Sequence, residues 1–208
     1  MFEKEEALMR KIYLSALVDM DLCNGCKICE NICVAKAIRV IDRKAIVDEE
    51  KCVSCMKCMD ACQPQAIAMT QRKEPLLLAV KTDEVDQEAL KELCARANMD
   101  PEEIICICTI TAAKEIVAAV LKGAKTPEEI TLMTGARSSC GMWCMAPMLR
   151  ILNAHGVELP EADNYRWYNL KSDLWHTGKE VDRKYPEYRL EEDKKLFREG
   201  TFHNLPRH

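Results

Sequence analysis

The sequence predicts an α+β protein in which two small repeated units are followed by a helical region and an extended C-terminal arm. Three observations support this fold class: an internal repeat with an offset of 29 residues, helices with strong capping signals, and a final stretch with weak periodicity. The length of 208 residues suits one or two small domains with an arm. We expect four segments, at residues 1–73, 74–103, 104–156 and 157–208.

The repeat covers residues 15–70. Val18–Cys23 aligns with Val47–Cys52, and three further cysteines of the first unit align with three of the second. Each unit is predicted to form a short strand, a cysteine loop, one helical turn and a second strand. Because such a unit is too small to bury a core alone, we expect the two units to pack together with pseudo-twofold symmetry.

Residues 74–103 are predicted to form a polar connector between the repeat and the helical region. Within it, residues 76–80 are apolar enough for a strand, and residues 86–98 predict a helix that ends before Pro101. Cys94 lies on the apolar face of this helix, distant in sequence from the other cysteines, and is expected to be a buried core thiol.

Residues 104–156 predict a small all-helical domain. Thr111 is a candidate N-cap for its first helix. A second helix is indicated by the capping box of Thr126 and Glu129, with a proline at the first helical position. A third helix is predicted from about residue 141 to residue 153.

Residues 157–208 are predicted to form an arm that binds a partner. From residue 161 onward the arm carries ten acidic and ten basic side chains and eight of the chain's eleven aromatic residues, but few of its segments have helical or strand periodicity. Tyrosine and tryptophan often anchor protein interfaces, because they bury a large area and have few rotatable bonds. The alternative is that the arm folds back over the chain's own domains.

Charge and hydropathy exclude several functional classes. A net charge of −4 gives no indication of binding to nucleic acid or to an anionic membrane surface. No apolar run approaches the ~20 residues of a membrane span, and the mainly acidic N-terminus does not have the apolar stretch of a signal peptide. We therefore expect a cytoplasmic protein whose 13 cysteines serve as thiolates for metal and do not form disulfides.

Eight cysteines form two runs of identical spacing within the repeat. The runs are Cys23-x2-Cys26-x2-Cys29-x3-Cys33 and Cys52-x2-Cys55-x2-Cys58-x3-Cys62. Two-residue spacers let a tight loop aim three thiolates at one four-iron cluster, while the fourth cysteine, on the helical turn, points to the other cluster. We therefore expect two 4Fe–4S clusters with crossed ligands. The first would take Cys23, Cys26, Cys29 and Cys62, and the second would take Cys52, Cys55, Cys58 and Cys33.

Through this repeated run, residues 15–70 resemble the bacterial-type two-cluster ferredoxins. One departure concerns the proline that usually follows the fourth cysteine: the first unit has Val34 there, and in the second unit the proline is displaced to Pro64. The alternative is a pair of zinc sites, since paired C-x2-C motifs also bind zinc. The spacing within each run and its repetition are not usual for zinc, so iron–sulfur clusters are favoured.

Four later cysteines indicate a third site. Cys106-x-Cys108 is followed by Cys140-x3-Cys144, with two predicted helices between the pairs. With their flanking residues, these cysteines are similar to the helical domain of bacterioferritin-associated ferredoxin over residues 104–154. The resemblance implies that Cys106, Cys108, Cys140 and Cys144 bind a 2Fe–2S cluster.

The second pair departs from the pattern of that family, which is usually C-x2-C. One added residue shifts the last ligand by about 100° around a helix, so the loop must compensate or the metal must differ. Another iron–sulfur cluster, a zinc ion, or four buried core thiols are the alternatives.

No catalytic site can be read from the sequence. The histidines at positions 155, 176, 203 and 208 form no metal-binding spacing, and the sequence has no phosphate-binding loop or nucleophile motif. Arg137 is expected to be solvated, with the steering of an acidic partner as the alternative. Trp143 is either a shield for the third cluster or a buried core indole.

The combination of domains resembles the iron–sulfur subunits of multi-subunit flavin dehydrogenases, such as those acting on amino acids, opines or glycerol 3-phosphate. The resemblance implies a non-catalytic electron-transfer subunit that relays single electrons between a flavoprotein dehydrogenase and an acceptor within a hetero-oligomer. Two alternatives stay open: a stand-alone soluble ferredoxin, and a metal-delivery or regulatory protein.

Protein reconstituted without oxygen is expected to contain about ten Fe per chain, because two four-iron clusters and one two-iron cluster account for twelve of the cysteines. Iron and zinc analysis of the purified protein checks this number. A content of about eight Fe with one Zn would contradict the 2Fe–2S cluster and leave the two 4Fe–4S clusters standing.

Overall fold

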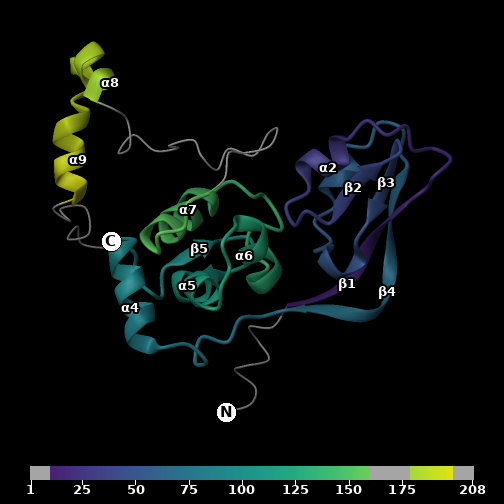
Figure 1. Cartoon of the computed structure of the whole chain (residues 1–208), viewed down its shortest axis with the longest axis horizontal. Helices are drawn as coiled ribbons and strands as arrows, with labels where there is room; N and C mark the ends of the chain where they lie inside the picture. The colour runs from purple at the N-terminus through teal and green to yellow at the C-terminus, as the bar shows by residue number, and fades with distance from the viewer. Residues whose placement is uncertain (1–9, 160–178, 199–208) are drawn as a thin grey trace. The chain divides into compact units, whose positions relative to one another are not determined.

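The N-terminal part of the chain is built on an antiparallel ribbon of two strands, β1 (Arg10–Val18) and β4 (Ile67–Leu78). In this computed structural model, which describes residues 10–159 and 179–198, the ribbon joins the first and last segments of the cysteine-rich repeat (Figure 1). Its register shifts between Ile12 and Leu14, opposite the stretch of β4 that contains Pro75. A proline has no backbone N–H to donate to the ladder, so the pairing is interrupted there.

A second antiparallel pair, β2 (Ile38–Ile41) and β3 (Lys44–Val47), joins the two repeat units. Its two turn residues, Asp42 and Arg43, both have positive φ angles of 48° and 62°. Two consecutive positive φ angles are typical of the type I′ turn, whose twist matches that of the flanking strands. The hairpin therefore places the first unit's last strand beside the second unit's first strand.

Three single-turn elements carry or precede the cysteine loops: α2 (Ile28–Ile32), η1 (Glu49–Lys51) and α3 (Lys57–Asp60). They close over a small core of alanine, valine, isoleucine and cysteine side chains that also includes the inward faces of the strands. Small residues dominate this core, so the backbone comes close to the cysteine sulfurs.

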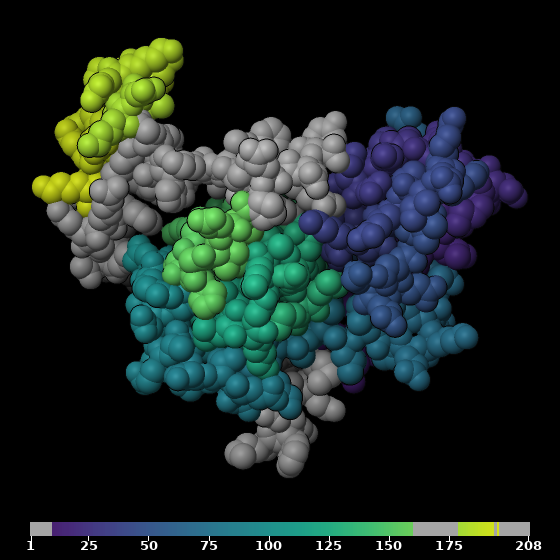
Figure 2. Space-filling view, viewed as in Figure 1, coloured from purple at the N-terminus to yellow at the C-terminus, as the bar shows by residue number. Residues whose placement is uncertain are grey.

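Four helices, drawn in Figure 1, form a second core within the same unit of the chain. Their residues gather as the teal and green surface in Figure 2. The helices are α4 (Gln87–Arg96), α5 (Ala113–Leu121), α6 (Pro127–Thr134) and α7 (Met145–Ala154). The largest fully buried side chains of this core include Ile116, Ile130 and Met148. As expected, Cys94 is a core thiol: it is 1% exposed and packs with Leu90 and Leu93 of α4.

The predicted connector does not form a separate segment in the structure. Strand β4 runs continuously to Leu78 and so crosses the boundary expected after residue 73. Helix α4 contributes to the same core as α5 and α7. The apolar face of α4, which includes Leu90 and Leu93, needs a partner surface, and the helical core provides it.

The expectation of an all-helical domain is wrong in one respect. A short antiparallel pair, β5 (Ile104–Cys106) and β6 (Thr111–Ala112), precedes the helices. The pair returns the chain over the loop that contains Cys108, and this places the first two cysteines of the third site next to the start of α5. Five residues of strand are too few to show alternation in a sequence, which is why the pattern predicted only helices.

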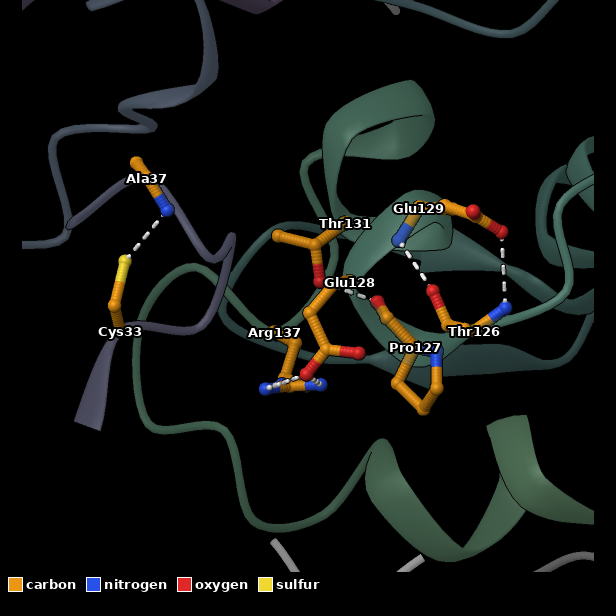
Figure 3. Close-up of polar contacts among 8 residues, drawn as sticks. All are labelled: Cys33, Ala37, Thr126, Pro127, Glu128, Glu129, Thr131 and Arg137. Carbon is orange, nitrogen blue, oxygen red and sulfur yellow. Dashed lines mark hydrogen bonds and ion pairs between the residues drawn. The ribbon is translucent and has the colours of Figure 1, made fainter. Parts of the chain in front are cut away.

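One predicted helix cap is confirmed and another is wrong. Thr126 Oγ1 accepts a hydrogen bond from the backbone N–H of Glu129 at 3.2 Å, and the Glu129 carboxylate accepts from Thr126 N at 3.1 Å (Figure 3). Helix α5 instead begins after Ala112, whose N–H donates to Glu115 Oε2 at 2.7 Å. Thr111 is buried in β6, where its hydroxyl accepts from Arg10 Nη2 at 2.9 Å.

The C-terminal segment is described over residues 179–198 and is not extended there. It forms α8 (Lys179–Lys184), the single turn η3 (Pro186–Tyr188) and α9 (Leu190–Arg198). Tyr185 and Tyr188 contact each other edge to face, with ring centroids 6.2 Å apart. The expectation of an extended arm is therefore wrong for these residues, while residues 160–178 and 199–208, with most of the arm's other aromatic residues, lie outside the described part.

Within the described residues, none of the helices is long and apolar enough to cross a membrane.

Replacement of Gly25 by alanine is expected to destabilise the repeat. Gly25 has a φ of +73°, and an added Cβ would lie 2.4 Å from the carbonyl oxygen of Arg43 in the β2–β3 turn. The backbone of that turn cannot move aside cheaply, so we expect a loss of roughly 3 kcal/mol. The urea midpoint for loss of cluster absorbance checks the result.

Gly156→Ala is the matched control, because Gly156 also has a positive φ (+84°) but nothing lies within 4 Å of the added Cβ. It should cost only about 1 kcal/mol, the strain of the left-handed backbone. Equal midpoints for the two variants would contradict the close packing of Gly25 on the turn.

Candidate metal centres

The structure groups the eight cysteines of the repeat around two hollows. The first hollow is lined by Cys23, Cys26 and Cys29 from the first run and by Cys62 from the second. Asn24, Gly25, Lys27 and several apolar residues complete its wall. Three cysteines of one run therefore line a hollow together with the last cysteine of the other run, as the predicted crossed ligand sets require.

The second hollow repeats this arrangement with the roles of the runs exchanged. It is lined by Cys52, Cys55 and Cys58 from the second run and by Cys33 from the first. Each hollow has a cavity volume of about 20 Å³. Two hollows of equal size and equivalent lining indicate that both sites are built for the same kind of group.

Backbone amides donate hydrogen bonds to several of these sulfurs. Ala37 N donates to Cys33 Sγ at 3.1 Å, as Figure 3 shows, and Ala66 N donates to Cys62 Sγ at 3.3 Å. In each case the donor lies four residues after the cysteine. An amide that points at a sulfur stabilises negative charge there, which suits a thiolate that ligates metal.

Two more amide–sulfur bonds cross between the repeat units. Ala16 N in the first unit donates to Cys52 Sγ at 3.4 Å, and Ala45 N in the second unit donates to Cys23 Sγ at 3.4 Å. Ala16 and Ala45 are separated by the same 29 residues as Cys23 and Cys52. Each unit therefore contributes an amide, as well as its fourth cysteine, to the site formed mainly by the other unit.

The two runs turn through equivalent strained residues. Lys27 precedes α2 with a φ of 64°, and Met56 precedes α3 with a φ of 61°. A left-handed residue between the second and third cysteines bends the loop sharply, so that both sulfurs can face one hollow.

Burial controls the protonation of the third cysteine in each run. Loss of solvent raises the pKa of Cys29 to about 11 and the pKa of Cys58 to about 12. Without a bound cation these thiols are neutral at physiological pH. Binding of iron must therefore displace their protons, which is the ordinary chemistry of a cysteine ligand.

The third site brings together the four later cysteines in two pairs. Cys108 Sγ and Cys140 Sγ lie 3.4 Å apart, and both residues are exposed. Cys106 and Cys144 are buried, and their side chains also share a hydrogen bond. This bond from Cys144, followed by smaller contributions from Thr109 and the amide of Arg137, lowers the pKa of Cys106 to about 5. The site therefore has a buried end and an end that faces solvent.

The loop between Cys140 and Cys144 accommodates the additional residue of the C-x3-C spacing. Helix α7 begins at Met145, later than the predicted residue 141, and Cys144 is its N-cap. Gly141 has a φ of +69°, which lets the chain turn before the helix. The backbone amides of Met142 and Trp143 donate to Cys140 and, with Cys108, hold the pKa of Cys140 below its ordinary value.

Arg137 is buried, so the expectation that it is solvated is wrong. Its side chain is 8% exposed and forms an ion pair with Glu128, which is 4% exposed, with Nη2 and Oε1 3.4 Å apart (Figure 3). Arg137 also has a φ of +70° and directs its backbone N–H to Cys106. Its buried ion pair therefore holds the loop that presents this amide to the third site.

Trp143 is 75% exposed and is not a core indole. Local sequence could not reveal this, because the loop conformation before α7 decides where the ring points.

Lys57 is a further residue that the sequence analysis did not single out. Its Nζ donates to the carbonyl oxygen of Cys140 at 3.4 Å and so joins the repeat to the third site.

The donor sets fit iron–sulfur clusters in their chemistry. Each set consists of four cysteine sulfurs, and backbone amides donate to cysteine sulfurs in all three sites. Within the described ranges, 10–159 and 179–198, no group of three or more histidine, cysteine or acidic residues is arranged to hold a single metal ion.

Comparison with known protein families agrees with two of these sites. Residues 45–68 match the family described as 4Fe-4S binding domain, and residues 104–154 match the BFD-like 2Fe-2S binding domain. These matches confirm the predicted order of a 4Fe–4S ferredoxin domain followed by a BFD-like domain, and they support a role in electron transfer. No curated protein and no solved structure was found to match the chain.

The 4Fe–4S match includes the second run of cysteines and not the first. A cluster on the first run, and the crossed ligand sets, therefore stay predictions.

Replacement of Cys33 by alanine is expected to damage the cluster held by Cys52, Cys55 and Cys58, although Cys33 belongs to the first run. The reason is that Cys33 lines the second hollow. Electron paramagnetic resonance of the reduced protein checks this, because the two 4Fe–4S clusters should contribute separate signals.

Cys62→Ala is the matched variant, and it should remove the signal of the first cluster. The crossed assignment would be wrong if Cys33→Ala removed only the first cluster's signal.

Proposed function

We propose that this chain is the iron–sulfur subunit of a multi-subunit oxidoreductase, in which it relays single electrons between a flavoprotein dehydrogenase and an acceptor. The matches to two kinds of iron–sulfur domain support the electron-transfer part of this proposal. Clusters held by cysteine thiolates would accept and release one electron at a time. A chain with several such sites suits transfer in successive short steps.

The twelve cysteines of the three sites are the proposed ligands. The two hollows and the crossed amide–sulfur bonds support two 4Fe–4S clusters, and their common 29-residue offset supports pseudo-twofold packing of the repeat. The proposed sets are Cys23, Cys26, Cys29 and Cys62 for the first cluster, Cys52, Cys55, Cys58 and Cys33 for the second, and Cys106, Cys108, Cys140 and Cys144 for the 2Fe–2S cluster.

The observation that carries the partner hypothesis is a set of exposed apolar side chains on the loops of the third site. This apolar rim consists of Ile107, Ile110, Met142 and Trp143, each within two residues of one of the site's cysteines. The four residues are between 67% and 77% exposed. Apolar surface in water costs about 25 cal/mol per Å², so such a grouping is typical of a surface that another protein covers.

The position of the apolar rim also suits electron transfer to that protein. It adjoins Cys108 and Cys140, the exposed end of the third site. A partner that covers the rim would exclude water from the cysteines and bring its own redox group near them. We further propose a cytoplasmic location, where thiolates stay reduced, and residues 157–208 as a second contact with the partner.

Replacement of Trp143 by serine is expected to reduce capture of the flavoprotein at least tenfold, because buried tryptophans are frequent hot spots of interfaces and a loss of about 1.4 kcal/mol is tenfold in affinity. The measurement is affinity purification of the tagged chain from its host, with flavin absorbance and mass spectrometry of the captured proteins.

Leu17→Ser is the control, because Leu17 is 55% exposed but lies on β1 and outside the third site. It should leave capture unchanged. Recovery of the wild-type chain as a clustered monomer without a flavoprotein would contradict the subunit proposal and favour a stand-alone ferredoxin. Capture of a ferritin or a metal pump would favour metal delivery.

A further inference from the structure

One open groove contains cysteines of two different sites. Its lining includes Cys55 of the second 4Fe–4S set, and Cys108 and Cys140 of the third set. Among the described residues that line it, no cysteine belongs to the first 4Fe–4S set. The second site and the third site therefore share a surface in which the first site has no cysteine.

Lys57 connects the two sites across this groove. It is the first residue of α3, directly before Cys58, and its backbone N–H donates to Cys55. Its side chain reaches the loop of the third site, where Nζ donates to the carbonyl oxygen of Cys140 at 3.4 Å. A single residue therefore contacts a cysteine of each set.

The receiving loop is shaped around the ammonium group. A Cβ at Gly141 would lie 2.9 Å from Lys57 Nζ, and Gly141 has a φ of +69°, which favours glycine. The flexible end of Lys57 could move away from an added Cβ, so the positive φ is what favours glycine at this position. The space left beside Gly141 admits the ammonium group next to the carbonyl oxygen of Cys140.

The internal repeat shows that the fold of the cysteine loop does not require this lysine. With the 29-residue offset, the position of Lys57 in the second run corresponds to Ile28 in the first run. Both residues begin a single helical turn between equivalent cysteines. The two runs share the same loop geometry, so a lysine at this position of the loop is a feature of the second run alone.

We propose that Lys57 is a positioning residue that joins the second 4Fe–4S site to the 2Fe–2S site, so that within this chain electrons pass between the third site and the second site and not between the third site and the first. This inference rests on the proposed electron-transfer function and adds the order of the sites. Four thiolates make each loaded site strongly negative, and two such sites repel each other. The ammonium group between them offsets that repulsion and makes the addition of an electron to either site easier.

The transfer between the sites is a one-electron exchange in which no covalent bond changes. The second site loses one electron and the third site gains it, or the reverse. In the purified chain, dithionite supplies the electron, so the partner flavoprotein is not needed for the test.

The test is Lys57→Ile, which installs the residue of the first run. It should lower the reduction potentials of the second 4Fe–4S cluster and of the 2Fe–2S cluster by about 59 mV each, a tenfold change in a one-electron equilibrium constant. The first cluster should be unchanged. The magnetic interaction between the second and third clusters, seen as splitting in the resonance spectrum, should weaken as the contact between the two parts loosens.

Lys44→Ile is the matched control. Lys44 Nζ donates to the carbonyl oxygen of Cys23 at 2.9 Å and also to that of Met20, so it is the corresponding cation of the first site. Its replacement should lower the potential of the first cluster only. Lys57→Arg keeps the charge. The equilibrium constants for reduction of both neighbouring clusters should therefore stay within a few-fold of their wild-type values.

Several results would overturn the proposal. A Lys57→Ile protein with full iron content and three unchanged potentials would do so, and so would a shift confined to the first cluster. If Lys57→Ile loses iron, Lys57→Arg decides, because arginine keeps the positive charge. Loss of the magnetic interaction in Lys57→Arg as well would indicate a purely structural role and would overturn the proposal. None of these results depends on capture of a partner, so this inference and the proposed function fail separately.

Discussion

The convergence of sulfurs from two chain segments on each hollow is the constraint on which the N-terminal half depends. Neither run lines its hollow alone, because the last cysteine of the other run completes the lining, and Ala16 and Ala45 donate their amides across the repeat. The β2–β3 hairpin and the β1–β4 ribbon hold the two units at the spacing that this exchange needs. A core of small residues follows from the same constraint, since the backbone must approach the sulfurs closely.

The third site is assembled differently, and the difference suits a different task. Its buried end, Cys106 and Cys144, belongs to the helical core, while Cys108 and Cys140 face solvent beside the apolar rim. The buried Arg137–Glu128 pair holds the loop whose amide faces Cys106. Such a pair contributes little net stability, because desolvation of both charges opposes their attraction, but removal of one partner would leave a costly buried charge. Support from the core on one side and exposure on the other suit the electron exchange with a partner that we propose.

Local signals in the sequence were reliable where a short segment contains the whole interaction. The capping box of Thr126 and Glu129 is confirmed because both hydrogen bonds form within four residues. Thr111 failed as a cap because its hydroxyl is engaged by Arg10, which is 101 residues away in sequence. Arg137 was expected in solvent for the same reason: its buried conformation depends on how α6 and the cysteine loop meet.

The sequence by itself determined the chemistry of this protein: the α+β class, the spacing of twelve sulfurs, and the order of the two kinds of iron–sulfur domain. These properties are local, since cysteine spacing decides which sulfurs a tight loop can present together. Only the tertiary structure decided that α4 joins the helical core, that Trp143 is exposed, and that Lys57 reaches Cys140. These features depend on contacts between segments that are distant in sequence, and the free energy of such contacts comes from packing and charge that local periodicity does not encode.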